Sequence, residues 1–176
     1  MTSTLKVDQI QNVAGNTGLQ LNSAGLVMPQ SIVFQVKGIN TAQSFQSLTK
    51  VQWTSVELDS AGYWDSTNHR FSPQTSGWYF FWGALRVRYP TINQYIRIIY
   101  SKNGYESEAD ERHLGVQYQF NGDYINNGTL PLASGLLYMN GSSDYVEVQV
   151  EGDETMEIHH GNARASHFGG MLIHKG

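Results

Sequence analysis

The sequence predicts an all-β protein, and three observations support this class. Glycine is frequent, at 18 of 176 residues, while charged residues make up only 15%, a composition typical of strands and turns rather than of a helical bundle. From Ser31 onward, short apolar or alternating segments are separated by turn sequences. No segment has the periodicity of a credible helix. We therefore expect a jelly-roll β-sandwich of about ten strands.

The expected strands follow one another at the short spacing that is typical of a sandwich. They cover residues 31–38, 50–59, 70–72, 77–88, 93–102, 112–120, 128–142, 144–152 and 166–175. Asn103-Gly104, after the fifth of these segments, predicts a type I′ hairpin turn, because both residues tolerate a positive φ.

The chain divides into two regions of different character. Residues 1–30 are rich in Asn, Gln, Gly and Ser, and hold two short alternating pieces that could not bury a core alone. Pro29 marks the boundary, so we expect a short extended N-terminal segment over residues 1–30 and a folded head over residues 31–176. The segment either binds another chain or packs back on its own domain. Five of its apolar residues are the candidates for this contact: Leu5, Val7, Ile10, Leu19 and Leu21.

Charge and cysteine content exclude several classes of function. Eleven basic residues against fifteen acidic ones give a net charge of −4, which argues against nucleic-acid binding. The absence of cysteine excludes a disulfide framework and thiolate metal sites. No run reaches the roughly 18 apolar residues of a membrane span, and the N-terminus lacks the apolar core of a signal peptide. We expect the chain to be made in a cytoplasm.

Motifs for catalysis and cofactors are missing from the sequence. It contains no G-x-S-x-G, H-E-x-x-H or Walker sequence. We therefore expect that the protein is not an enzyme and binds no cofactor. An enzyme that cleaves glycans with two carboxylates from distant loops stays an open alternative. The acidic segments 106–111 and 151–155 lack EF-hand spacing and are expected to be solvated loops. His159 and His160 are neighbours, and neighbours on a strand point to opposite faces. We therefore expect no metal site there.

A motif in the middle of the chain resembles the globular head of the complement component 1q family, the jelly roll shared with tumour-necrosis-factor-like trimers. The resemblance spans about 120 residues, from Val51 to Ile173. Within "YWDSTNHRFSPQTSGWYFFW" and further along the chain, the matching positions are Asp65, Phe71, Pro73, Gly77, Tyr79, Phe81, Lys102, Asn103, Gly104, Phe168, Gly170 and Leu172. The resemblance implies a trimer.

The sequence departs from the pattern of the complement component 1q family in several places, and these differences argue against one group of its relatives. No collagen-like stalk of Gly-X-Y triplets precedes the head, Ser143-Asp144 replaces the usual Gly-Asp, one extra residue lies between Tyr63 and Asp65, and cysteines are absent. We therefore do not expect a secreted animal cytokine.

The N-terminal segment resembles a different group of proteins. "TLKVDQIQNVAGNTGLQLNSAGLV" is similar to N-terminal segments of bacteriophage structural proteins, especially tail fibres and related appendages. Together the two resemblances imply a homotrimeric virion protein, attached to other virion proteins through residues 1–30 and displaying its head, with tail or capsid left open. The alternative is a soluble glycan-binding lectin or adhesin.

The strand "GWYFFWGALRVR", residues 77–88, is apolar on both faces as far as Ala84. We assign one set of side chains to the protomer core, together with two residues of the last strand: Tyr79, Phe81, Leu85, Phe168 and Leu172. The other set would leave a sticky patch in a monomer, and we assign it to the trimer interface: Trp78, Phe80, Trp82 and Arg86. Tyr118 and Tyr124 flank the turn "QFNGD" and are the candidates for contact with a host glycan or protein.

Overall fold

The computed structural model describes residues 9–11, 17–21, 27–28, 31–88, 94–104, 113–120, 128–160 and 165–176. The chain splits into two compact units, Met1–Ser31 and Ile32–Gly176. In the first unit, three short strands form one antiparallel sheet in the order of their sequence: β1 (Gln9–Gln11), β2 (Thr17–Leu21) and β3 (Val27–Met28). Ile10 pairs with Leu19 in its register. Leu5 and Val7 lie outside the described residues.

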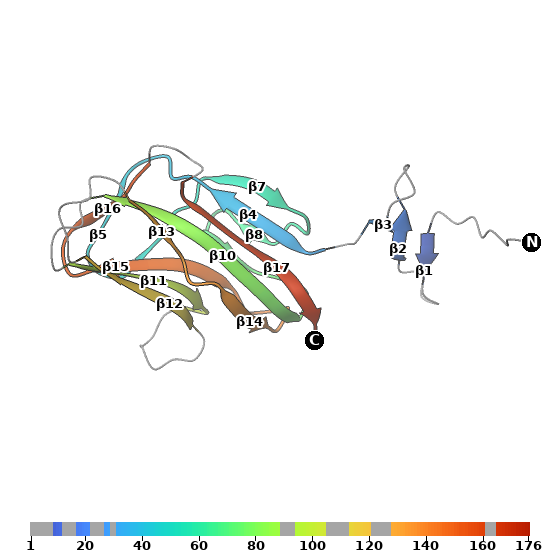
Figure 1. Cartoon of the computed structure of the whole chain (residues 1–176). Coiled ribbons are helices and arrows are strands. Elements are labelled where there is room, and N and C mark those ends of the chain that lie inside the picture. The colour runs from blue at the N-terminus through green and yellow to red at the C-terminus, as the bar shows by residue number, and fades with distance from the viewer. Residues whose placement is uncertain are drawn as a thin grey trace, which may run out of the picture. The chain divides into compact units, whose positions relative to one another are not determined.

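The second unit is a sandwich of two antiparallel sheets (Figure 1). The eight-stranded sheet has the order β5 (Gln43–Phe45), β16 (Met156–Ile158), β10 (Gly77–Arg88), β17 (His167–Lys175), β4 (Val33–Lys37), β7 (Ser55–Asp59). Residues 77–81 of β10 pair with both β17 and β14, so β14 (Gly135–Met139) lies on the opposite edge of β10 from β17. That edge continues into β13 (Gly128–Pro131).

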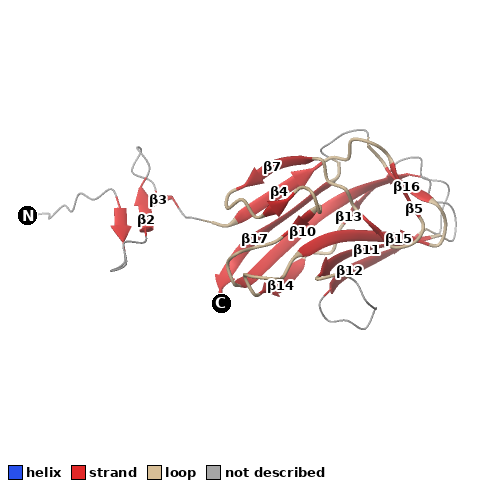
Figure 2. Cartoon of the chain, turned by 180° about the vertical axis from the view of Figure 1, so that it is seen from behind, coloured by secondary structure: helices blue, strands red, loops and turns tan. Residues whose placement is uncertain are grey.

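The six-stranded sheet covers the other side of the core, as the view from behind shows (Figure 2). Its order is β12 (His113–Gln119), β11 (Tyr95–Lys102), β15 (Val146–Gly152), β9 (Arg70–Phe71), β8 (Trp64–Asp65), with β6 (Thr49–Lys50) also paired to β15. All elements of the described residues are strands. In that part of the chain, no helix is long and apolar enough to cross a membrane.

These sheets confirm the predicted all-β jelly roll but contain more strands than expected. The head has fourteen strands in its described residues rather than about ten. The segments 50–59 and 128–142 each contain two strands instead of one. Asn103 and Gly104 have φ values of 61° and 88°, as a type I′ turn requires. The next described strand nevertheless begins at His113, so the connection is longer than the predicted two-residue hairpin.

Aromatic rings fill the space between the sheets. Phe34 of β4 stacks on Phe71 of β9, with ring centroids 4.0 Å apart and an interplanar angle of 12°. Phe168 of β17 packs edge-on against Phe34 at 5.0 Å, and Phe81 of β10 stacks on Phe168 at 6.0 Å. All four side chains are fully buried. This cluster joins the two sheets and fixes which face of β10 points inward.

A polar network ties the end of β11 to the turn that precedes β15. The buried carboxylate of Asp144 accepts hydrogen bonds from Asn103 Nδ2 at 2.7 Å and from the Asn140 amide at 2.8 Å. Lys102 Nζ lies 2.9 Å from Asp144 Oδ2 and donates to the Tyr138 carbonyl at 2.7 Å. Burial by itself raises the pKa of Asp144, but the hydrogen bonds from Asn103, Lys102 and Asn140 outweigh it and hold that pKa below its usual value.

Candidate functional site

The long strand β10 lies inside the eight-stranded sheet and presents different side chains to its two sides. Tyr79, Phe81 and Leu85 point inward and are fully buried, as is Phe168 of β17. Leu172 is half-buried and packs against the edge of the core. The five residues assigned to the protomer core from the sequence therefore all contact it, four of them with no exposed surface.

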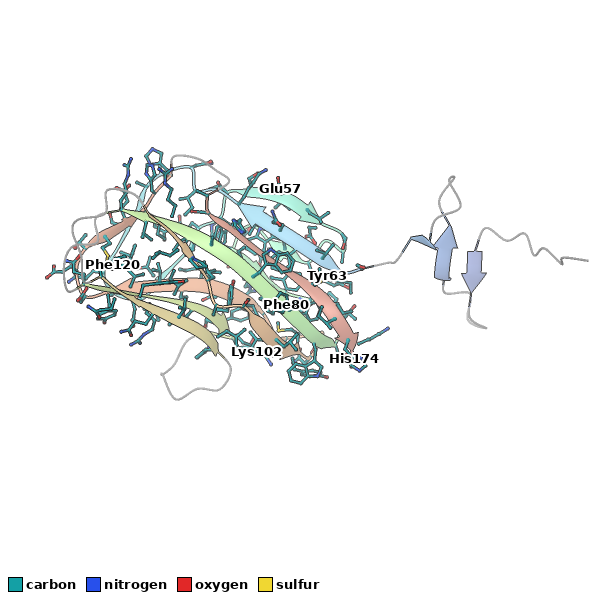
Figure 3. The ribbon with its side chains drawn as sticks, viewed as in Figure 1. Glu57, Tyr63, Phe80, Lys102, Phe120 and His174 are labelled. Carbon is teal, nitrogen blue, oxygen red and sulfur yellow. The ribbon has the colours of Figure 1, made fainter. Side chains whose placement is uncertain are left out.

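The opposite side of β10 begins an apolar surface that three strands share. Trp78 pairs with Tyr138 of β14 on one side and with His174 of β17 on the other. Phe80 pairs with Leu136 and with Met171 in the same way, and Figure 3 labels Phe80 within β10 and His174 near the end of β17. We call this surface the outer apolar face and define it by Trp78, Phe80, Trp82, Leu136, Tyr138 and Met171.

Most of these side chains keep substantial exposed surface in the single chain. Leu136 is 48% exposed, Trp78 44% and Tyr138 41%, while Phe80 and Trp82 are half-buried. The rings already contact one another, with Phe80 and Trp82 stacked at 6.2 Å and an interplanar angle of 26°. A contiguous apolar patch of this kind on a soluble protein typically marks an interaction surface.

Gly169 lets Trp82 lie close against the sheet. A Cβ on Gly169 would come within 2.7 Å of Trp82 Cζ2 and 2.9 Å of the Phe34 carbonyl oxygen, and both approaches are shorter than atoms tolerate. Gly169 is the register partner of Trp82. The glycine therefore sets the position of one ring on the outer apolar face.

The face becomes polar toward the other end of β10. Ala84 is almost buried, and Arg86 and Arg88 are half-buried. Beyond β17, a hollow is lined by Gln35, Lys37, Glu57 and His167. Glu57 accepts a hydrogen bond from Gln35 Nε2 at 2.9 Å and forms an ion pair with Lys37. These groups form a charged border next to the apolar rows.

Sequence reasoning found only the part of this surface that β10 contributes. Leu136, Tyr138 and Met171 were not singled out, because their partner strands are far away in sequence. The sequence of β14, GLLYM, was a usable signal because it is apolar at consecutive positions. Such a strand is apolar on both faces, and here Leu136 and Tyr138 are exposed whereas Leu137 and Met139 are buried. Arg86, assigned to the interface from the sequence, lies at the polar end rather than among the rings.

Of the two residues proposed for receptor contact, Tyr118 lies in the described part of the chain. Tyr118 is half-buried, packs against the core, and donates a hydrogen bond from its hydroxyl to the Pro131 carbonyl. Burial raises the pKa of that hydroxyl. Tyr124 lies outside the described residues, and receptor contact by either tyrosine stays a prediction.

A histidine pair after β16 departs from the strand geometry assumed above. The strand ends at Ile158, and the ring centroids of His159 and His160 lie 5.1 Å apart. Glu157 Oε1 lies 3.7 Å from His159 Nδ1. Burial lowers the pKa of His159, and the positive charges of Arg88 and Arg86 lower it further. The expectation that the two histidines could not share an ion does not hold.

The two sheets define a jelly roll of the complement-1q and tumour-necrosis-factor type. No model of a protein family matches the sequence, and no curated protein is found similar to it. Solved structures are similar in fold. The globular domain of zebrafish complement 1qA has 11% identity and a TM-score of 0.57, covering 83% of this chain and 99% of its own.

Two further structures have the same fold. Eiger TNF from S. frugiperda has 13% identity and a TM-score of 0.59, covering 83% of this chain and 94% of its own. Murine APRIL has 10% identity and a TM-score of 0.56, covering 81% of this chain and 99% of its own. At such low identity, these similarities establish the fold of the head and not its activity.

Proposed function

We propose that the chain is a homotrimeric structural protein of a bacteriophage particle, a fibre or appendage subunit of the tail or capsid. Residues 1–30 attach it to other virion proteins, and the jelly-roll head is displayed outward for attachment to the host surface. The proposal assigns the chain no catalytic step and no cofactor, and it places the mature protein in the virion after synthesis in the host cytoplasm.

The observation that carries the trimer is the outer apolar face. Three adjacent strands leave large apolar side chains exposed in rows, and the rows lie on the sheet face opposite the core. Covering this surface stabilises the protein at roughly 25 cal/mol per Å² of apolar area. The fold resembles that of a family of trimeric heads, which favours a closed ring of three copies over an open chain.

Support for the virion assignment comes from the N-terminal unit. Its sequence resembles N-terminal segments of phage structural proteins, and its three strands are only three, five and two residues long, at or below the usual length of a strand. Such a segment needs a partner to cover its apolar residues. We propose that Leu5, Val7, Ile10, Leu19 and Leu21 make that contact with another virion protein.

Incorporation into particles tests the proposal. Phage carrying the full chain and phage carrying a chain that lacks residues 1–30 are purified, and the protein is sought in the particles by mass spectrometry. We expect only the full chain in particles, while the shortened chain stays trimeric in the lysate. A shortened chain found in particles, or a full chain absent from them, contradicts the proposal.

The same material separates the proposal from a free lectin. The full chain with Gln117→Glu, an exposed change on β12, serves as the control and should enter particles normally. A full chain that is absent from particles and binds host-surface glycans on its own would support the lectin alternative instead.

A further inference from the structure

The group formed by Glu157, His159 and His160 has the composition of a transition-metal site. One candidate ligand atom from each of the three residues lies within 4.8 Å of the other two. Imidazole nitrogens with one carboxylate oxygen are the ligands that Zn²⁺ commonly takes in proteins. Among the described residues, no other set of three or more such side chains comes this close together.

Two of the candidate ligand atoms are buried without a hydrogen-bond partner. Nδ1 of His159 and Oε1 of Glu157 make no hydrogen bond to the described part of the chain. The His159 side chain is more than nine-tenths buried, so its unpaired nitrogen is costly unless something binds it. The two atoms lie 3.7 Å apart, close enough for one ion to contact both after a small adjustment, given ligand distances of about 2.0–2.2 Å.

His160 completes the group from the solvent side. Its side chain is exposed, so the ring can turn toward an ion without disturbing the core. Its ring already meets that of His159 edge-on, with an interplanar angle of 66°. Three protein ligands leave the fourth position of a tetrahedral ion for water.

Two arginines oppose a cation at this place. Arg88 Nη1 lies 3.8 Å from Glu157 Oε1, and both Arg86 and Arg88 are close enough to affect His159 electrostatically. Their positive charge repels a divalent ion, so binding should be weaker than at a structural zinc site.

We propose that Glu157, His159 and His160 bind Zn²⁺ or a similar first-row divalent ion, one per chain. The site is independent of the proposed virion role, because its residues lie outside the outer apolar face. It restrains the end of β16 by linking the strand residue Glu157 to the two histidines that follow the strand.

Titration calorimetry of the full chain with zinc chloride near neutral pH tests this site. We expect one ion per chain, with affinity at least about tenfold weaker in His160→Ala and in Glu157→Gln, the lower end of the loss caused by disturbing a metal ligand's support. His174→Ala is the matched control, since His174 is also an exposed histidine and lies on β17, and it should bind as the unaltered chain does.

A thermal melt provides the second measurement, and His160→Ala keeps the test interpretable because its side chain is exposed. Zinc should raise the melting temperature of the unaltered chain and of His174→Ala, and should not raise that of His160→Ala. Equal binding by His160→Ala and the unaltered chain, or a loss in His174→Ala as large as that in His160→Ala, would overturn the proposal.

Discussion

The rings of Trp78 on β10 and Tyr138 on β14 meet edge to face, with centroids 5.7 Å apart and an interplanar angle of 65°. The two residues are register partners, yet Trp78 keeps 44% of its surface exposed and Tyr138 keeps 41%. The two rings are therefore in contact within the chain while part of each stays uncovered. That combination is suited to packing against a second copy.

Replacing Trp78 with glutamate should separate the trimer into monomers. Burying the exposed part of this ring contributes roughly 2–3 kcal/mol per protomer, and the new carboxylate would have to be desolvated in the interface. Light scattering of the variant should give the mass of one chain. Because Trp78 lies outside the core, circular dichroism should remain that of the folded head.

The control for this change is Gln117→Glu, which adds the same charge on the exposed side of the six-stranded sheet. It should remain a trimer. If Gln117→Glu dissociated as readily as Trp78→Glu, or if Trp78→Glu stayed trimeric, the interface would lie elsewhere.

Two adjacent glycines of β17 should respond differently to the same substitution. A Cβ on Gly170 would meet Phe81 Cδ1 at 2.7 Å and Phe34 Cε1 at 2.8 Å, so Gly170→Ala should lower the free energy of unfolding by about 1–3 kcal/mol. A Cβ on Gly169 would approach the Phe34 carbonyl oxygen at 2.9 Å and also displace Trp82, so Gly169→Ala should weaken self-association more than Gly170→Ala does. Urea unfolding should show Gly170→Ala as the less stable variant, and mass measured on dilution should show Gly169→Ala as the one that dissociates more readily. The reverse order in both measurements would contradict the assignment of faces.

Truncating Phe71 should damage the core without affecting the outer apolar face directly. Phe71 is fully buried and stacks on Phe34, so Phe71→Ala should cost about 3–5 kcal/mol of unfolding free energy. The comparison is best made in the Trp78→Glu background, where we expect unfolding of a monomer. Gln117→Ala in the same background should change stability little, and a loss for Phe71→Ala no larger than this control would argue against the core described above.

The carboxylate of Asp144 should make the head sensitive to acid. Its pKa is lower in the folded chain than its usual value, so its stabilising contribution is present above the unfolded pKa of about 3.9 and is lost as pH falls through the folded pKa. Asp144→Asn should cost about 1–3 kcal/mol near neutral pH. The difference in stability between the variant and the unaltered chain should shrink below about pH 4.

Urea unfolding at a series of pH values measures this effect. Glu154→Gln is the control, because it removes one negative charge from an exposed position. A stability difference for Asp144→Asn that stays constant from neutral pH to acid would show that the network does not depend on the charge.

Strong local signals explain which parts of the fold were predictable from the sequence. The bounds expected for β10, Gly77 to Arg88, are those observed, because an aromatic run between turn residues defines a strand by itself. The alternation of that run also separated Tyr79 and Phe81, which are buried, from Trp78, which is exposed. Periodicity alone determines which residues share a face.

Pairing between distant strands explains what the sequence did not predict. The outer apolar face needs β14 and β17 on either side of β10, and no local pattern specifies that register. The segment 128–142 divides into two strands where the Leu132 amide donates to the Gly83 carbonyl. The geometry of His159 and His160 depended on where β16 ends, and strand ends are the least predictable feature of a sequence.

The mass of the full chain in solution shows whether three copies assemble. Light scattering coupled to size exclusion, at micromolar concentration and near neutral pH, should give three times the 19.7 kDa of one chain. A mass of one chain under these conditions would show that self-association does not cover the outer apolar face. That result would contradict the proposed trimer.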